Sequence, residues 1–304
     1  MGVVTADPPQ PDRAHPERPR ARVVATLLDW YDEFARDLPW RRAEATPWGV
    51  MVSEFMLQQT PVNRVLGPWH EWLARWPTPA ALAADPAAEA VRAWGRLGYP
   101  RRAQRLHAAA TAIVTEHAGV VPDTVAELKA LPGVGDYTAA AIASFGFGRR
   151  EPVVDTNVRR VLQRLEDPSG ERPPSVADRA LALAWLPDDA TTAARWAAAS
   201  MEFGALVCTA RAPRCDDGCP VAAQCAWNLA GRPEPAVAPR RPQDWHGTDR
   251  QCRGVLLAEL RHHHDGRTRA QLLARWHDAT QAERCLASLL EDGLARESGS
   301  VITL

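Results

Sequence analysis

Four of the six cysteines lie close together, in the spacing Cys208-x6-Cys215-x3-Cys219-x5-Cys225. Four thiolates on a short stretch of chain can hold a [4Fe–4S] cluster, and they can equally hold a structural zinc ion. The spacing by itself does not separate these two metal centres. It does argue against disulfides, because clustered cysteines in a chain without a secretion signal are typical of metal ligation.

Two carboxylates occupy settings that suit catalysis. Glu54 lies in the apolar stretch 53–60, SEFMLQQT, where a glutamate is either a surface residue or a carboxyl group that its surroundings keep neutral. Asp155 precedes a second helical segment, which is amphipathic. In its simplest structural role it is the N-cap of a helix whose buried face contains Val158, Val161 and Leu162.

A glycine turn, Leu131-Pro132-Gly133-Val134-Gly135, lies between two helical segments. Glycines let the backbone turn tightly and present successive N–H groups at the start of the next helix. Such groups bind a phosphate oxygen without any basic side chain. A turn of this kind is also a common helix connection, so the phosphate interpretation needs support from neighbouring motifs.

The elements that position these residues are helices. Apolar residues recur every three to four positions from Val23 to about Ala230, and proline and glycine fall between the periodic segments, where they end helices. We therefore predict an all-α domain over residues 23–230. The clearest helical segments are 24–31, 65–73, 108–113, 139–145, 158–165 and 193–206.

Composition marks the ends of this domain. Residues 1–22 are rich in proline and arginine, which predicts a disordered tail. Residues 231–246 have the composition of a linker. In residues 247–304, three amphipathic stretches precede two short β-prone pieces, which indicates a small winged-helix-like module. The three stretches are 254–260, 269–276 and 282–290.

Composition also bounds the function. The chain has 304 residues, of which 46% are hydrophobic and 24% charged, and its formal net charge is −1. No apolar run is long enough to span a membrane, and the first residues lack the apolar centre of a signal peptide. We therefore expect a cytoplasmic protein with no membrane partner. A net charge near zero does not exclude DNA, because a local basic patch is enough to bind phosphates.

An ordered series of motifs resembles the MutY-type adenine DNA glycosylases, of the helix-hairpin-helix, endonuclease III-like superfamily. The resemblance covers about residues 28–230, and the stretch 54–60 separates this family from its endonuclease III relatives. The motifs are Leu38-Pro39-Trp40-Arg41, Ser53-Glu54-x-Met56-Leu57-Gln58-Gln59-Thr60, Leu97-Gly98-Tyr99, Leu131-Pro132-Gly133-Val134-Gly135, Val154-Asp155-x-Asn157-Val158-x-Arg160-Val161, Met201-Glu202-x-Gly204-Ala205 and the four cysteines.

The resemblance implies a helix-hairpin-helix glycosylase fold and a [4Fe–4S] cluster on Cys208, Cys215, Cys219 and Cys225. It further implies base excision repair of double-stranded DNA, by removal of adenine mispaired with 8-oxoguanine or guanine. Glu54 would protonate the adenine and Asp155 would stabilise the cation formed at C1′. Tyr137 and Asn157 would support the carboxylate and the sugar.

The resemblance also implies the DNA contacts. Trp40 and Arg41 would lie near the adenine pocket, and the run Gln58-Gln59-Thr60 would lie at the mispair, where Gln59 and Tyr99 would fill or wedge the stack. Pro132, Gly133, Val134 and Gly135 would hold a backbone phosphate.

Tyr137 also bears on the type of reaction. Relatives that cut the strand carry a lysine two positions after the second hairpin glycine, where this chain has Tyr137, and its only lysine is Lys129. We therefore expect a monofunctional glycosylase. Separately, we expect the protein to be a monomer and to act in the cytoplasm at the nucleoid.

Two features depart from the family. Three residues separate Cys215 from Cys219 where the family has two, and residues 247–304 do not resemble the nudix-like domain that reads 8-oxoguanine. Cys252 and Cys285 fall on predicted helices of that last region, where we expect buried free thiols.

Two other functions stay open. A mismatch thymine or uracil glycosylase of the same superfamily is disfavoured by the run Gln58-Gln59-Thr60. A DNA-binding protein without catalysis is disfavoured by the presence of both Glu54 and Asp155.

Overall fold

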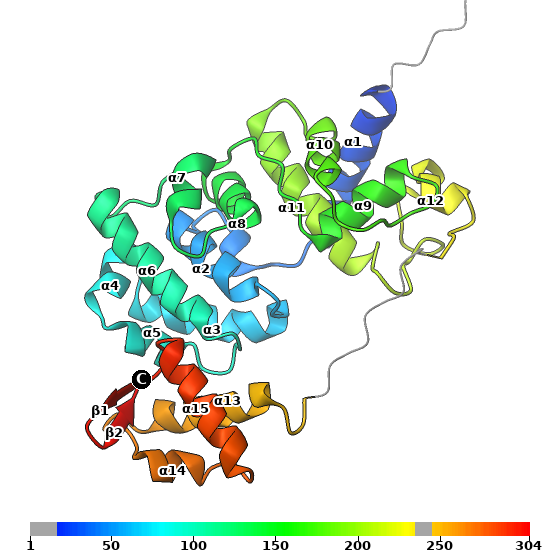
Figure 1. Cartoon of the computed structure of the whole chain (residues 1–304). Coiled ribbons are helices and arrows are strands. Elements are labelled where there is room, and N and C mark those ends of the chain that lie inside the picture. The colour runs from blue at the N-terminus through cyan, green and yellow to red at the C-terminus, as the bar shows by residue number, and fades with distance from the viewer. Residues whose placement is uncertain (1–16, 235–244) are drawn as a thin grey trace, which may run out of the picture. The chain divides into compact units, whose positions relative to one another are not determined.

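The computed structural model describes residues 17–234 and 245–304, which fold into two units (Figure 1). The cysteine unit combines residues 17–35 with 154–234, and the hairpin unit combines 36–153 with 245–304. Nearly all regular structure in these residues is helical, with two strands of three residues each, which confirms the all-α prediction. The predicted domain 23–230 is thus divided between two units. Residues 23–35 and 154–230 pack around one apolar core, and residues 36–153 pack around another.

Three helices that lie side by side form the cysteine unit: α1 (Glu17–Phe34), α11 (Ala190–Leu206) and α9 (Thr156–Glu166) (Figure 1). In its core Trp30 of α1 meets Phe203 of α11 edge to face, with ring centroids 5.2 Å apart. Helix α1 begins inside the tail predicted for residues 1–22, and residues 1–16 of that tail lie outside the described residues. The shorter elements are α10 (Ala177–Ala184), η3 (Ala222–Gln224) and α12 (Ala226–Leu229).

Helix α2 (Pro47–Leu57) is the centre of the hairpin unit. Thr46 caps its start by accepting the N–H of Gly49 at 3.1 Å, and Pro47 fits the first turn, where no N–H is needed. Every residue from 48 to 56 is buried, as expected of a helix that neighbours surround. The other elements are η1 (Pro39–Arg41), α3 (Val62–Arg75), α4 (Pro79–Ala84), α5 (Ala87–Ala93), α6 (Arg101–Glu116), α7 (Val125–Ala130), α8 (Asp136–Ala141) and the π-helical turn η2 (Ile142–Gly146).

The C-terminal module, residues 245–304, has the predicted three helices followed by a β-hairpin. Arg267 also bridges to Ile302, so one further strand position precedes the second helix, as in a winged helix. The first helix is longer than the predicted stretch 254–260, because Thr248 caps it by accepting the N–H of Gln251. The elements are α13 (Asp249–His262), α14 (Arg269–Leu273), α15 (Ala279–Glu291), β1 (Arg296–Ser298) and β2 (Val301–Thr303).

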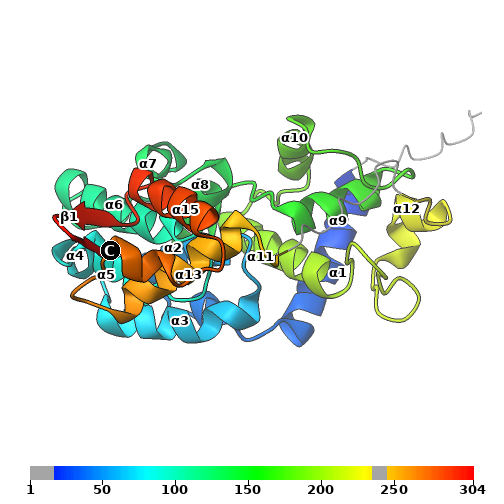
Figure 2. The same cartoon turned by 60° about the horizontal axis from the view of Figure 1, so that its bottom comes forward.

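This module packs within the hairpin unit against α5 and α6, as Figure 2 shows. Two arginines bind the last turns of the facing helices. Arg92 of α5 donates to the carbonyl oxygens of Leu260 and Arg261 at the end of α13, and Arg261 donates to that of Val91 at the end of α5. The module shares one apolar core with the preceding helices. It is therefore joined to them by packing, whereas the predicted linker 231–246 lies largely outside the described residues. None of the described helices is long and apolar enough to cross a membrane.

Candidate active site

Glu54 lies in the buried middle of α2, with 5% of its surface exposed. The alternative that it is a surface residue is therefore wrong. Its neighbour Ser53 is also buried and donates its hydroxyl to the carbonyl oxygen of Val50 at 2.7 Å. Glu54 thus lies among mostly apolar residues of a buried helix.

Arg102 on α6 joins the two loops that carry Gln59 and Tyr99. Its buried guanidinium makes six hydrogen bonds of 2.5–3.1 Å, all to uncharged oxygens, and burial lowers its pKa to about 10. Gln59 and Tyr99 have φ values of 54° and 47°, which are uncommon for residues with a side chain. Both line one groove of about 1290 Å³. The acceptors of Arg102 are the carbonyl oxygens of Phe55, Met56, Gln58, Leu97 and Gly98 and the hydroxyl of Thr60.

The other residues expected near the base are less exposed. Thr60 is buried, and its hydroxyl also donates to the carbonyl oxygen of Leu97 at 3.3 Å, so it supports the loop. Trp40 is buried in the core, with its ring centroid 5.8 Å from that of Trp69. Arg41 and Gln58 are half-buried.

The glycine turn 131–135 connects α7 to α8 and makes the predicted hairpin. Gly133 has φ 80°, and a Cβ atom there would lie 2.7 Å from the Cβ of Arg105, so only glycine fits without a shift. Val134 is buried and anchors the turn, whereas Pro132 and Gly135 are exposed. The first N–H groups of α8 therefore lie at the surface, and Tyr137 sits half-buried in the same helical turn.

Asp155 is the N-cap of α9, as the sequence predicts. The N–H of Val158 donates to one carboxylate oxygen at 2.6 Å, and the side-chain amide of Asn157 donates to the other at 2.8 Å. Burial raises the pKa of Asp155, and these two donors counteract part of that rise. The carboxylate is therefore fixed in orientation by two short contacts.

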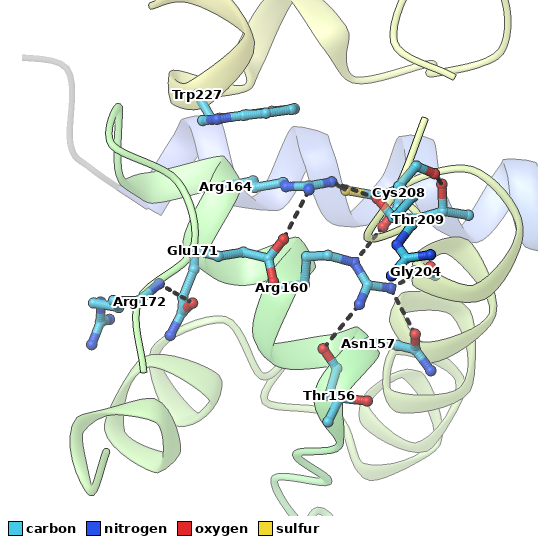
Figure 3. Close-up of polar contacts among 12 residues, drawn as sticks. Thr156, Asn157, Arg160, Arg164, Glu171, Arg172, Gly204, Cys208, Thr209 and Trp227 are labelled. Carbon is cyan, nitrogen blue, oxygen red and sulfur yellow. Dashed lines mark hydrogen bonds and ion pairs between the residues drawn. The ribbon is translucent and has the colours of Figure 1, made fainter. Parts of the chain in front are cut away.

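Arg160, one turn further along α9, connects Asn157 to the cysteine loop (Figure 3). Its guanidinium donates to Oδ1 of Asn157 at 2.7 Å, to the carbonyl oxygen of Gly204 at 2.6 Å and to that of Cys208 at 2.7 Å. Asn157 in turn packs so closely on α11 that a Cβ atom on Gly204 would lie 2.8 Å from its Cβ. One arginine thus ties the partner of Asp155 to the backbone of a predicted metal ligand.

The four clustered cysteines surround one small pocket. Its other walls are largely apolar, and burial raises the pKa of Cys219 to about 12. Thiols in such a place become thiolates only if a cationic centre stabilises them. Within the described residues, no three His, Cys, Asp or Glu side chains converge closely enough to hold a single metal ion. Four thiols around one pocket are the ligands that a [4Fe–4S] cluster takes.

Arg164 lines this pocket, and Figure 3 shows its side chain beside Cys208 and Trp227. Its guanidinium donates to the sulfur of Cys208 at 3.4 Å and to Glu171 at 2.8 Å, and it lies 4.2 Å from the ring centroid of Trp227. These contacts fix a cationic group beside the cysteine loop; its charge lowers the pKa of Cys215, although burial raises that pKa by more.

The structure brings together only some of the predicted residues within each unit. Asp155, Asn157 and Cys208 are linked in the cysteine unit, whereas Glu54 and Tyr137 belong to the hairpin unit. Sequence reasoning gave no role to Arg102, Arg160 or Arg164. The signal was present, since an arginine on the apolar face of a helix marks a buried hydrogen-bonding centre.

The sequence matches a family model described as "HhH-GPD superfamily base excision DNA repair protein" over residues 52–187. It is 52% identical over 273 residues to an adenine DNA glycosylase of Mycolicibacterium smegmatis, which covers 90% of this chain and 92% of the relative. An adenine DNA glycosylase of Mycobacterium tuberculosis is also 52% identical, over 91% of both chains.

Solved structures agree on the fold. A thermostable thymine-DNA glycosylase superposes with a TM-score of 0.64 at 26% identity, over 70% of this chain and 98% of that one. An endonuclease III bound to DNA superposes with a TM-score of 0.58 at 23% identity, over 69% of this chain and 96% of that one. With 52% identity to adenine DNA glycosylases along most of its length, the chain belongs to that family of helix-hairpin-helix DNA repair glycosylases.

Proposed function

We propose that the protein excises adenine mispaired with 8-oxoguanine or guanine in double-stranded DNA, as a monomeric and monofunctional glycosylase of base excision repair. The observation that carries this proposal is the burial of Glu54, a carboxyl group inside an apolar helix of a chain that closely resembles adenine glycosylases. A surface glutamate would have no such use.

Breaking the N-glycosidic bond requires a better leaving group than the adenine anion. Protonation of a ring nitrogen supplies it, and Glu54 is the group we assign as the acid. The bond then breaks toward an oxocarbenium-like sugar.

Asp155 is the group we assign to that positive charge. Its carboxylate accepts one hydrogen bond on each oxygen, from Val158 and from Asn157, and each oxygen keeps lone pairs for the sugar. Because the helix supplies one donor and Arg160 orients the other, the carboxylate is held before substrate binds. The protein therefore does not have to reorganise as the charge develops.

DNA binding requires that the adenine leave the stack. The exposed Gln59 and Tyr99, on the walls of one groove, are suited to fill the space that it leaves. The hairpin 131–135 is suited to hold a phosphate through the N–H groups of α8, which fixes the register without reading sequence.

We also propose that the four cysteines bind a [4Fe–4S] cluster, and the alternative is zinc. The cluster would supply a rigid cross-link of the loop 208–225, and Cys208, which would be its first ligand, is bonded to Arg160 and Arg164. Iron and sulfide analysis of the purified protein decides between the two. A brown protein with about four iron atoms per chain supports the cluster, and a colourless zinc protein refutes it.

The deciding experiment is a single-turnover assay of the wild type beside Glu54→Gln, with Glu116→Gln as a matched control on an exposed residue. Duplexes would contain A opposite 8-oxoguanine, A:G, T:G or U:G, each read with and without alkali. We expect alkali-dependent cleavage at the adenine in the wild type and the control, and none in Glu54→Gln. Cleavage of T:G or U:G alone would overturn the substrate, and binding without any cleavage would overturn catalysis.

A further inference from the structure

Tyr99 is an exposed side chain that two arginines hold in place. Its side chain sits on a backbone with φ 47°, and 42% of the residue is exposed. A residue with a side chain is strained in this region of backbone space and needs support from its surroundings. Arg102 lies 5.5 Å from the ring centroid, and Arg250 lies 4.9 Å from it.

Arg250 comes from the C-terminal module, in the first turn of α13. Its guanidinium also lies 5.3 Å from the ring centroid of Trp245, so the cation contacts two aromatic rings, Tyr99 and Trp245. All three residues line the groove that also contains Gln59. These cation–π contacts therefore join the module to the loop that carries Tyr99.

The start of α13 is firmly held, which fixes where Arg250 can lie. Gln281 on α15 donates to the carbonyl oxygen of Gly247 at 2.9 Å and to the carboxylate of Asp249 at 2.8 Å. Arg284 donates to the same carboxylate at 2.8 Å, and these contacts lower the pKa of Asp249 to about 2. Residue 250 follows directly on this anchor, so its backbone cannot drift away from the groove.

We propose that Arg250 is a positioning residue for Tyr99, through which the C-terminal module prepares the loop to wedge the DNA stack. The expected effect on the DNA stack rests on the proposed function, whereas the contact between Arg250 and Tyr99 is present in the protein without DNA. A guanidinium over the ring restricts the Tyr99 side chain before DNA binds, so less side-chain freedom is lost on binding. Exposed contacts of this kind contribute about 0.5–1 kcal/mol, which corresponds to about a 2- to 5-fold effect.

The first test needs neither DNA nor activity. The chain has three tyrosines, Tyr31, Tyr99 and Tyr137, so protein made with fluorotyrosine gives three fluorine NMR signals, and Tyr99→Phe identifies one of them. We expect Arg250→Ala to move the Tyr99 signal alone. Arg296→Ala removes the same charge from an exposed site in the module, on β1, and should leave the Tyr99 signal in place. An unmoved signal in Arg250→Ala would overturn the proposal.

The second test measures base opening with 2-aminopurine placed beside the mispaired adenine. Arg250→Ala should weaken the fluorescence rise on binding and slow single-turnover excision, each by about 2- to 5-fold. In a Tyr99→Ala background the same change should have no further effect, because the partner is gone. Arg250→Lys, which keeps the charge but loses the planar guanidinium over the ring, separates the contact with Tyr99 from phosphate attraction.

Three outcomes of this second test overturn the proposal. They are an equal loss with and without Tyr99, full activity in Arg250→Lys, and an effect of Arg296→Ala as large as that of Arg250→Ala. If instead the wild type excises no adenine, the proposed function fails while the fluorine result still decides the contact.

Discussion

Gly204→Ala tests the support of Asp155 without touching a catalytic group. The new Cβ would lie 2.8 Å from the Cβ of Asn157 and 2.9 Å from its carbonyl oxygen, whereas ordinary contact begins near 3.4 Å. Asn157 must therefore move away by about 0.6 Å, and its side-chain amide, which donates to Asp155, moves with it. A misplacement of 1 Å can cost about 100-fold in rate, so we expect single-turnover excision to fall by roughly 10-fold.

The same substitution also carries a stability signal. Overpacking costs about 1–3 kcal/mol, while alanine in place of glycine inside a helix gains about 1 kcal/mol. Gly254→Ala is the matched control, because it lies inside α13 with nothing within 4 Å of the new Cβ. We expect Gly254→Ala to melt higher than the wild type and Gly204→Ala to melt lower than Gly254→Ala, by about 2–4 °C for each kcal/mol.

Two outcomes for Gly204→Ala would contradict these expectations. If Gly204→Ala excises adenine at the wild-type rate and melts as high as Gly254→Ala, then α11 does not press on Asn157 as described. A lower melting temperature with an unchanged rate would keep the clash and refute the role of Asn157 in holding Asp155.

Three further predictions concern the cysteine unit. Asp155→Asn should abolish excision, yet its melting temperature relative to the wild type should rise from pH 4 to pH 7. The reason is that burial raises the pKa of Asp155, so its ionised form opposes folding above that pKa and the cost vanishes below the ordinary value of 3.8, while asparagine keeps the helix cap. Arg160→Lys should lower both the iron content and the excision rate, because lysine cannot reproduce the planar set of bonds to Asn157, Gly204 and Cys208; full iron with an unchanged rate would contradict this. Cys219→Ser should lower iron binding and the melting temperature together, measured by iron analysis and circular dichroism, and a variant that loses iron without any loss of stability would show that the centre does not hold the loop.

The helical fold could be predicted from the sequence because its signals are local. Apolar periodicity marks α9 and α11, and glycine and proline mark the hairpin 131–135. The C-terminal module was predictable for the same reason. The division into two units was not, since it depends on α1 packing against α11, a contact between residues more than 150 positions apart that no local pattern encodes.

The sequence was enough to predict the residues of the candidate site, but not the buried arginines that hold them in position. The role of Asp155 as an N-cap follows from residue type and position alone, and the structure confirms it. The burial of Glu54 did not follow, because an apolar stretch with one acid is compatible with a surface stripe until the neighbours of α2 are known. The positions of Arg102 and Arg160 on apolar helix faces indicate that they are buried, but residue type does not show which backbone oxygens of distant segments they bind.

The six bonds of Arg102 have a consequence for how this protein can change. One guanidinium binds both the turn at 58–60 and the turn at 97–98. Neither turn can therefore be lengthened, shortened or shifted without breaking the hydrogen bonds that Arg102 makes to the other. The two turns therefore behave as one rigid unit, and only paired changes in them would be tolerated. A redesign aimed at a different base would have to keep this arginine and alter only the side chains that project from the part it holds.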